Sequence, residues 1–177
     1  MNPERAQARQ QCEELVLALK IPEPFDLGSL CQSLGAQRQR PIVLMPTAMA
    51  FGSLCGLWLG TARADYVFYE ENTSRLHQKH IVCHEIGHIL RQHSASRTLN
   101  SDVARALTAA VEPGEVQRVL GRDTYNDDQE FEAELIATLI IRRVSRKQAV
   151  DSPMAVNPSA QGAIARIARS LSRGDQS

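Results

Sequence analysis

Two histidines placed four residues apart constrain this chain more than any other feature of its sequence. Residues 84–88 read HEIGH, so that Glu85 and two further residues stand between His84 and His88. In an α-helix, residues four apart lie on one face and about 6 Å apart along the axis. Both imidazoles can therefore bind one metal ion, with Glu85 beside them and outside the ligand set. The spacing predicts a metal site built on a helix.

The residues around HEIGH predict the helix itself. Apolar residues recur at helical spacing on both sides of the histidines, which favours a helix over residues 73–92. Thr73 or Ser74 is expected to be its N-cap. Gly87 is a poor helix former. Its place inside the helix indicates that another backbone or a substrate comes close to the metal here.

A third ligand must come from elsewhere, because a catalytic zinc usually has three protein ligands and one water. A long, mostly apolar helix predicted over residues 127–147 carries Glu130, Glu132 and Glu134. Glu130 and Glu134 are one turn apart, on a face with two alanines that can contact Gly87. We therefore expect Glu130 to be the third ligand and Glu134 to contact a ligand histidine. Glu132 is the alternative ligand.

Two imidazoles and one carboxylate around zinc support a defined chemistry. The ion lowers the pKa of a bound water to about 7 and polarises a carbonyl group. Glu85 can then take the proton of the water and deliver it to the leaving amine. The residues predict a zinc-dependent endopeptidase in which Glu85 is catalytic and Zn²⁺ is held by His84, His88 and Glu130.

Composition limits the other functions open to the chain. It has 177 residues, of which 20 are basic and 20 are acidic, giving a formal net charge of zero. This length is typical of one domain, and the charge balance argues against nucleic-acid binding as the main function. Four scattered cysteines form no CxxC pair, which favours reduced, buried thiols. Because residues 1–11 lack the apolar core of a signal peptide, we expect a cytoplasmic protein.

A stretch without charged residues covers residues 41–62 and raises the question of a membrane segment. Two prolines and several glycines interrupt it, and the remaining pieces are rich in β-forming residues. We therefore expect two buried strands, at about 41–45 and 55–60, and no membrane segment. A hairpin turn at residues 61–64 leads to a third strand at about 65–70.

Helices are predicted on both sides of these strands. They are expected over residues 4–19, over 26–34 with Asp26 as N-cap and Gly35 at the end, after Ser101, after Pro113 and over 127–147. Residues 1–147 then form one α+β domain, helical with a small three-stranded antiparallel sheet. Residues 148–177 are expected to be a flexible tail. A short amphipathic helix that presents Ile164, Ile167 and Leu171 can form within this tail and dock on the domain.

The other histidines and a tyrosine are weaker candidates for the site. His80 lies one turn before His84 and is expected to be a buried, hydrogen-bonded structural residue. His77 and His93 are expected on the helix surface. Tyr125, just ahead of the long helix, is a candidate for stabilising an oxyanion.

HEIGH and the segment EFEA at residues 130–133 resemble the ImmA/IrrE family of metallopeptidases. The order of elements is also similar: a helix, short strands, an aromatic strand at residues 66–68 and then the metal helix. The combination of HExxH with a later ExEA helix is more specific than HExxH alone. The resemblance covers residues 10–145 and implies a small zinc peptidase with gluzincin-like metal-site helices. It also implies a partner, because family members cleave or otherwise inactivate helix-turn-helix repressors and so relieve repression.

The same ligands also fit a function of another class. In a non-hydrolytic regulator, zinc only holds the fold and the domain acts by binding a repressor or another partner. A toxin–antitoxin component acting by protein contact is a third hypothesis. The peptidase and the regulator differ in whether a Glu85→Gln protein still relieves repression.

Overall fold

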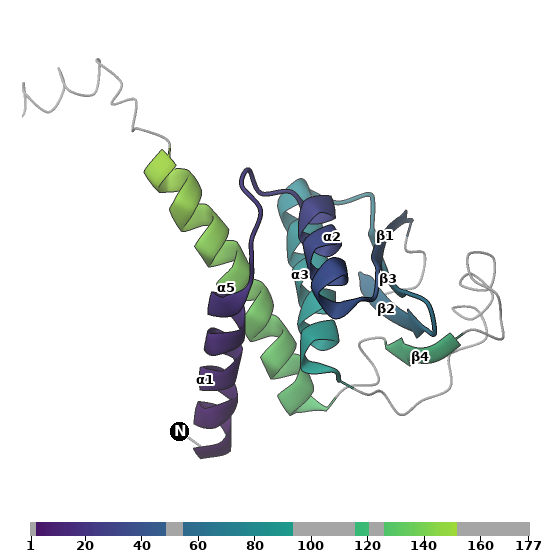
Figure 1. The fold of residues 1–177 in the computed structure, drawn as a ribbon, viewed down its shortest axis with the longest axis horizontal. Coiled ribbons are helices and arrows are strands. Elements are labelled where there is room, and N and C mark those ends of the chain that lie inside the picture. Colours follow the sequence, from purple (N-terminus) through teal and green to yellow (C-terminus); the bar gives the residue numbers. More distant parts are fainter. Residues whose placement is uncertain (1–2, 49–54, 94–115, 121–125, 152–177) are drawn as a thin grey trace, which may run out of the picture. The chain divides into compact units, whose positions relative to one another are not determined.

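The structure, a computed structural model, describes residues 3–48, 55–93, 116–120 and 126–151. In this part of the chain there are four helices and one sheet of four strands (Figure 1). The helices are α1 (Pro3–Ala18), α2 (Leu27–Arg38), α3 (Arg75–Arg91) and α5 (Asp127–Asp151). The strands are β1 (Ile42–Thr47), β2 (Gly56–Thr61), β3 (Asp65–Glu70) and β4 (Val116–Leu120). The predicted α+β class is confirmed.

The sheet is mixed, so the prediction of an antiparallel sheet is wrong in part. Its strand order is β1-β3-β2-β4. β2 pairs antiparallel with β3 and with β4, whereas β1 runs parallel to β3. The apolar pattern of a segment identifies a strand but not the direction of its neighbour. β4 also lies where the sequence predicts a helix after Pro113, and the helix predicted after Ser101 falls outside the described residues.

The hairpin between β2 and β3 forms at residues 61–64, as predicted. The backbone N–H groups of Arg63 and Ala64 donate to Thr61 Oγ1 at 3.2 and 3.0 Å. The backbone N–H of Thr61 in turn donates to the carbonyl of Ala64 at 2.9 Å. This hydroxyl-centred turn places Asp65 at the first position of β3, where it is buried.

Asp65 joins the sheet to the end of α2. Its carboxylate accepts hydrogen bonds from Arg38 Nη1 at 2.7 Å and from Trp58 Nε1 at 3.0 Å, and Arg40 Nε lies 3.2 Å away. Its backbone N–H donates to the carbonyl of Pro41 at 2.8 Å. A buried carboxylate is stable only when it is paired and hydrogen-bonded. These contacts therefore hold the start of β1 beside the start of β3 and favour the parallel pairing.

α3 is the central element of the helical part. It packs with α2 on the sheet, while α1 and α5 lie on its other side (Figure 1). Every residue from Ile81 to Ile89 is buried. The core contains apolar side chains from α1, α2, α3, α5 and the strands β1 to β3. HEIGH therefore lies where the sheet layer and the outer helices meet.

The predicted start of α2 is confirmed, and its predicted end is wrong. Asp26 is the N-cap, as predicted, and its carboxylate accepts from the N–H of Ser29 at 2.8 Å. The helix continues past Gly35 to Arg38, so the prediction that Gly35 ends it is wrong. Gly35 serves close packing instead, because an added Cβ would lie 3.1 Å from the carbonyl oxygen of Arg40 and 3.2 Å from the N of Ile42.

Residues up to Val144 belong to one compact unit, and α5 itself continues to Asp151. The flexible tail stays a prediction, and its amphipathic segment lies outside the described residues.

In the part of the chain that the structure describes, no helix has the length and apolar character needed to cross a membrane. All four cysteines are free thiols, and three of them are buried.

Replacing Gln39 by glycine is expected to stabilise the protein. Gln39 follows α2 with a φ of 54°, in the left-handed region where a side chain costs about 1 kcal/mol. Gln39→Gly should raise the free energy of unfolding by up to about 1 kcal/mol in chemical denaturation. Gln32→Gly, at an exposed position inside α2, should lower it by about 1 kcal/mol. A similar loss at both positions would contradict the assigned end of α2.

Candidate metal centre

α3 presents both histidines of HEIGH from one buried face. Ser74 is its N-cap, one of the two residues predicted, and accepts from the N–H of His77 at 3.2 Å. His84 and His88 are 7% and 0% exposed. Their rings lie edge to face with centroids 4.8 Å apart, and the two Nε2 atoms are 3.1 Å apart. Two imidazole nitrogens are therefore directed at one point, as the spacing predicts.

Close contact between α3 and α5 brings the third residue to this point. A Cβ added at Gly87 would lie 2.8 Å from Ala133 Cα and 2.9 Å from its carbonyl oxygen. Real side chains do not approach so closely, so glycine is required for this spacing of the two helices. Ala133 and Ala137 are fully buried, in line with the small-residue contact expected from the sequence.

Glu130 completes a group that could hold a metal ion. Its Oε2 lies 3.5 Å from His84 Nε2, and its Oε1 lies 3.5 Å from His88 Nε2. One ligand atom from each of the three residues can be chosen so that all lie within 4.8 Å of one another. The structure thus brings together the three residues expected to be ligands.

The chemistry of this group fits a cation. Glu130 Oε1 is buried and makes no hydrogen bond in the described part of the chain. A buried carboxylate oxygen without such a bond is costly unless a cation compensates it. Burial and the neighbouring histidines His84 and His93 lower the pKa of His88 to about 2, so the ring is neutral at pH 7 and has a lone pair to donate.

Glu134 lies beside the other ring nitrogen of His84. Its Oε2 is 3.5 Å from His84 Nδ1 and 3.1 Å from His80 Nε2. Burial lowers the pKa of His84, but the contact with Glu130 and the charges of nearby carboxylates outweigh burial and raise it overall. His80 is hydrogen-bonded, as expected, but it is half-buried rather than buried. Glu134 therefore stands where a partner of a ligand histidine was expected.

Glu132, the alternative ligand, lies elsewhere. Its carboxylate accepts from Arg91 Nε at 2.6 Å and Nη2 at 3.0 Å, and His93 Nε2 lies 2.9 Å from its Oε2. Burial raises the pKa of Glu132, but the bonds from Arg91 and His93 outweigh it and lower the pKa overall. Glu132 is thus held by a bidentate ion pair and is not one of the residues grouped around the Nε2 atoms.

For His93, the position predicted from the sequence is wrong. It was expected on the helix surface, whereas it is buried and its Nδ1 lies 2.9 Å from Nδ1 of His88. Burial lowers the pKa of His93 despite its contact with Glu132. His77, by contrast, is exposed, as predicted, and its ring contacts Thr73 Oγ1 at 2.9 Å. Tyr125 lies outside the described residues.

Glu85 faces the sheet beside the ligand histidines. It is 6% exposed, and a Cβ added at Gly56 of β2 would lie 2.7 Å from its Oε1. Glu85 and His84 line a cavity of about 40 Å³, together with Cys55, Gly56, His77, His80 and Ile81. This volume is large enough for a water molecule. The carboxylate of Glu85 thus borders a space that His84 also borders.

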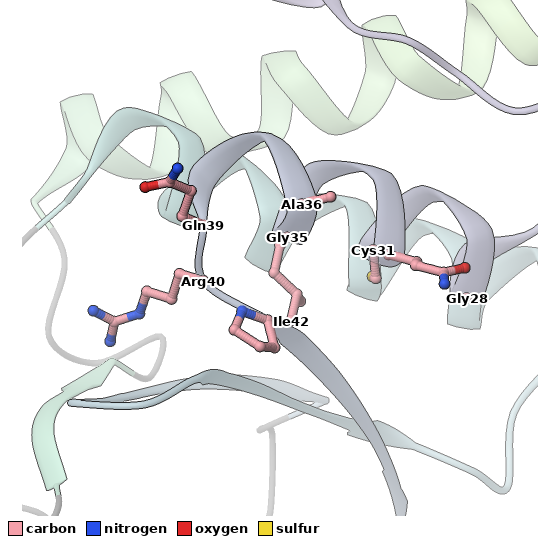
Figure 2. Close-up of a pocket in the computed structure, with 9 residues that line it drawn as sticks. Gly28, Cys31, Gly35, Ala36, Gln39, Arg40 and Ile42 are labelled. Carbon is pink, nitrogen blue, oxygen red and sulfur yellow. The ribbon is translucent and has the colours of Figure 1, made fainter.

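A larger cavity, of about 520 Å³, lies between α2 and the segment leading into β1 (Figure 2). Gly28, Cys31, Gln32, Gly35, Ala36, Gln39, Arg40, Pro41 and Ile42 line it. Of these residues only Arg40 is charged, and its guanidinium contacts Asp65 and the carbonyl of Thr61. The lining therefore offers no carboxylate or imidazole for catalysis, in contrast to the metal group.

Comparisons with known proteins give no family for this chain. No protein-family model matches the sequence, and no curated protein and no solved structure matches it.

Gly87→Ala tests the helix contact. In an ordinary helix this change stabilises by about 1 kcal/mol. Here the added methyl group meets the backbone of Ala133, so the variant should lose about 1–3 kcal/mol of unfolding free energy. Its affinity for Zn²⁺ should also fall, because Glu130 is pushed away from the histidines. A gain in stability with unchanged affinity would show that the contact is not required.

His84→Ala and Glu130→Ala test the ligand group directly. Each removes one of the three converging ligands, so Zn²⁺ bound per chain after dialysis should fall from about one to near zero for His84→Ala. Glu130→Ala should weaken binding strongly. Glu14→Ala, at an exposed position of α1, is the matched control and should bind zinc as the unmodified chain does. Elemental analysis measures the zinc content of each variant, and thermal unfolding checks that the variant is folded. Unchanged zinc content in His84→Ala would exclude this ligand set.

Proposed function

We propose that this chain is a zinc-dependent endopeptidase. One observation carries the proposal: atoms of His84, His88 and Glu130 lie within 4.8 Å of one another, and Glu85 is on α3 beside the two histidines. Three ligands with a neighbouring carboxylate that is not a ligand is the arrangement found in catalytic zinc sites of the HExxH type. A purely structural zinc site usually has four protein ligands and no such carboxylate.

The donor set supports zinc as the ion. Two imidazoles and one carboxylate suit Zn²⁺, whereas Ca²⁺ and Mg²⁺ prefer oxygen ligands alone. When bound, zinc supplies a Lewis acid for the scissile carbonyl and lowers the pKa of a water. His84, His88 and Glu130 would hold the ion with three protein ligands, the number typical of catalytic rather than structural zinc sites.

Glu85 is proposed as the general base and acid. Its carboxylate borders the small cavity between α3 and the start of β2, within reach of a water held there. It takes a proton from the attacking water and gives it to the leaving amine. Burial beside Gly56 restricts the carboxylate to this region, which favours proton transfer in a fixed geometry.

The substrate is proposed to be a helix-turn-helix transcriptional repressor, cleaved in the cytoplasm to relieve repression. Support comes from the resemblance of HEIGH and EFEA to the ImmA/IrrE metallopeptidases and from the predicted ligand roles of His84, His88 and Glu130. The formal net charge of zero agrees with a protein substrate rather than nucleic acid. The gluzincin-like character of the helices is part of the same proposal.

Glu85→Gln separates catalysis from metal binding. The amide keeps the size of the side chain but cannot take a proton, so cleavage should slow by about 10²–10⁴-fold while Zn²⁺ content stays at one per chain. The assay incubates the purified chain with the helix-turn-helix protein encoded beside its gene, with and without zinc, and follows a discrete cut by mass spectrometry.

Glu14→Gln, an exposed change on α1, is the matched control and should cleave at the unmodified rate. A Glu85→Gln protein that cuts at the full rate would refute the role of Glu85. Relief of repression by a Glu85→Gln protein that does not cut would support the non-hydrolytic regulator instead.

A further inference from the structure

His93 reaches the metal group because of the way α3 ends. Gln92 adopts the left-handed conformation with a φ of 53°. Its N–H donates to the carbonyl of Ile89, and the N–H of His93 donates to the carbonyl of His88 at 3.1 Å. This pair of bonds is a Schellman motif, which places the residue after the left-handed one against the residue five positions earlier. In many helices two apolar side chains make that contact, and here two imidazoles make it.

A continuous chain of polar contacts then runs from His88 to an arginine. His88 Nδ1 lies 2.9 Å from His93 Nδ1, and His93 Nε2 lies 2.9 Å from Glu132 Oε2. Arg91 closes the chain with two bonds to the Glu132 carboxylate, at 2.6 and 3.0 Å. The side chain of Glu132 is 13% exposed, so water competes little for these contacts.

The positions of the protons follow from these contacts. To bind a metal through Nε2, the neutral ring of His88 must carry its proton on Nδ1. Nδ1 then donates to Nδ1 of His93, which must accept and so carries its own proton on Nε2. That proton faces Glu132 Oε2, a carboxylate that accepts only. Each contact is satisfied by one tautomer of each ring.

We propose that His93, Glu132 and Arg91 are positioning residues that fix the tautomer of His88, so that its Nε2 lone pair faces Glu130 and His84. Without the carboxylate, the opposite arrangement is equally well bonded: His93 Nδ1 donates to His88 Nδ1, and His88 carries its proton on Nε2. In that arrangement the proton of His88 points at Glu130 Oε1, 3.5 Å from Nε2, and blocks the ligand position.

This inference rests on the metal group of the proposed function but not on its peptidase activity. It is tested by NMR of the zinc-loaded full chain with ¹⁵N-labelled histidine, which reports the protonated nitrogen of each ring. The expected spectrum has the proton on Nδ1 of His88 and on Nε2 of His93. A proton on Nδ1 of His93 in the zinc-loaded protein would overturn the inference.

Zinc affinity, measured by competition with a chromophoric chelator, gives a second test. His93→Phe removes the acceptor and Glu132→Gln weakens the end of the chain, and each should lower the affinity by about 10–100-fold. His93→Asn, whose Oδ1 can stand near the position of Nδ1, should recover part of the loss. Glu13→Gln on α1, at a half-buried position paired with Arg9 and outside the contact chain, is the matched control for Glu132→Gln and should leave the affinity unchanged.

The outcomes separate this inference from the proposed function. Unchanged zinc affinity in both the His93→Phe and the Glu132→Gln variant overturns the inference and leaves the peptidase proposal standing. A chain that binds zinc and responds to these variants but cuts no substrate supports the inference and contradicts the peptidase. An unmodified chain that binds no zinc overturns both.

Discussion

The contact between Gly87 and Ala133 is the constraint on which the metal group depends. With a Cβ at position 87, the backbone of α5 could not lie as close to α3 as it does. Glu130, one turn before the contact residue Ala133, reaches the two Nε2 atoms because of this short separation. Glycine inside a helix costs about 1 kcal/mol relative to alanine. At position 87, however, only glycine allows the two helices to lie this close.

Three glutamates of α5 have three different surroundings, and the end of α3 provides the surroundings of Glu132. Glu130 faces the ligand atoms and Glu134 lies beside the outer nitrogen of His84. Glu132 lies on another side of α5, where Arg91, the last residue of α3, donates two hydrogen bonds to its carboxylate. The turn at Gln92 folds His93 back against His88, and this side chain and Arg91 meet Glu132 there. The end of α3 thus connects His88 to a carboxylate on the neighbouring helix.

The parts of this structure that follow from local periodicity could be predicted from the sequence. The helical spacing of HEIGH, the N-cap at Asp26 and the turn at residues 61–64 all depend on neighbours in sequence, and the structure has them. The buried place of His93 depends on a left-handed glutamine, a conformation that glycine or asparagine would have signalled and glutamine does not. The parallel pairing of β1 depends on Asp65 contacts with residues about 25 positions earlier. No local pattern encodes either.

The electrostatics of the site give a physical reason for a cation that is independent of any resemblance. Burial lowers the pKa of His88 and His93, so neither ring contributes a positive charge at pH 7. Glu132 is balanced by Arg91. The remaining carboxylates, Glu85, Glu130 and Glu134, surround His84 and raise its pKa even though burial opposes this. Glu130 Oε1 is buried without a hydrogen bond in the described part of the chain, and a buried carboxylate oxygen is costly when no cation or donor lies beside it. His84, His88 and Glu130 could hold a divalent cation, which would supply positive charge beside Glu130, so we expect cation binding and folding of this site to be coupled.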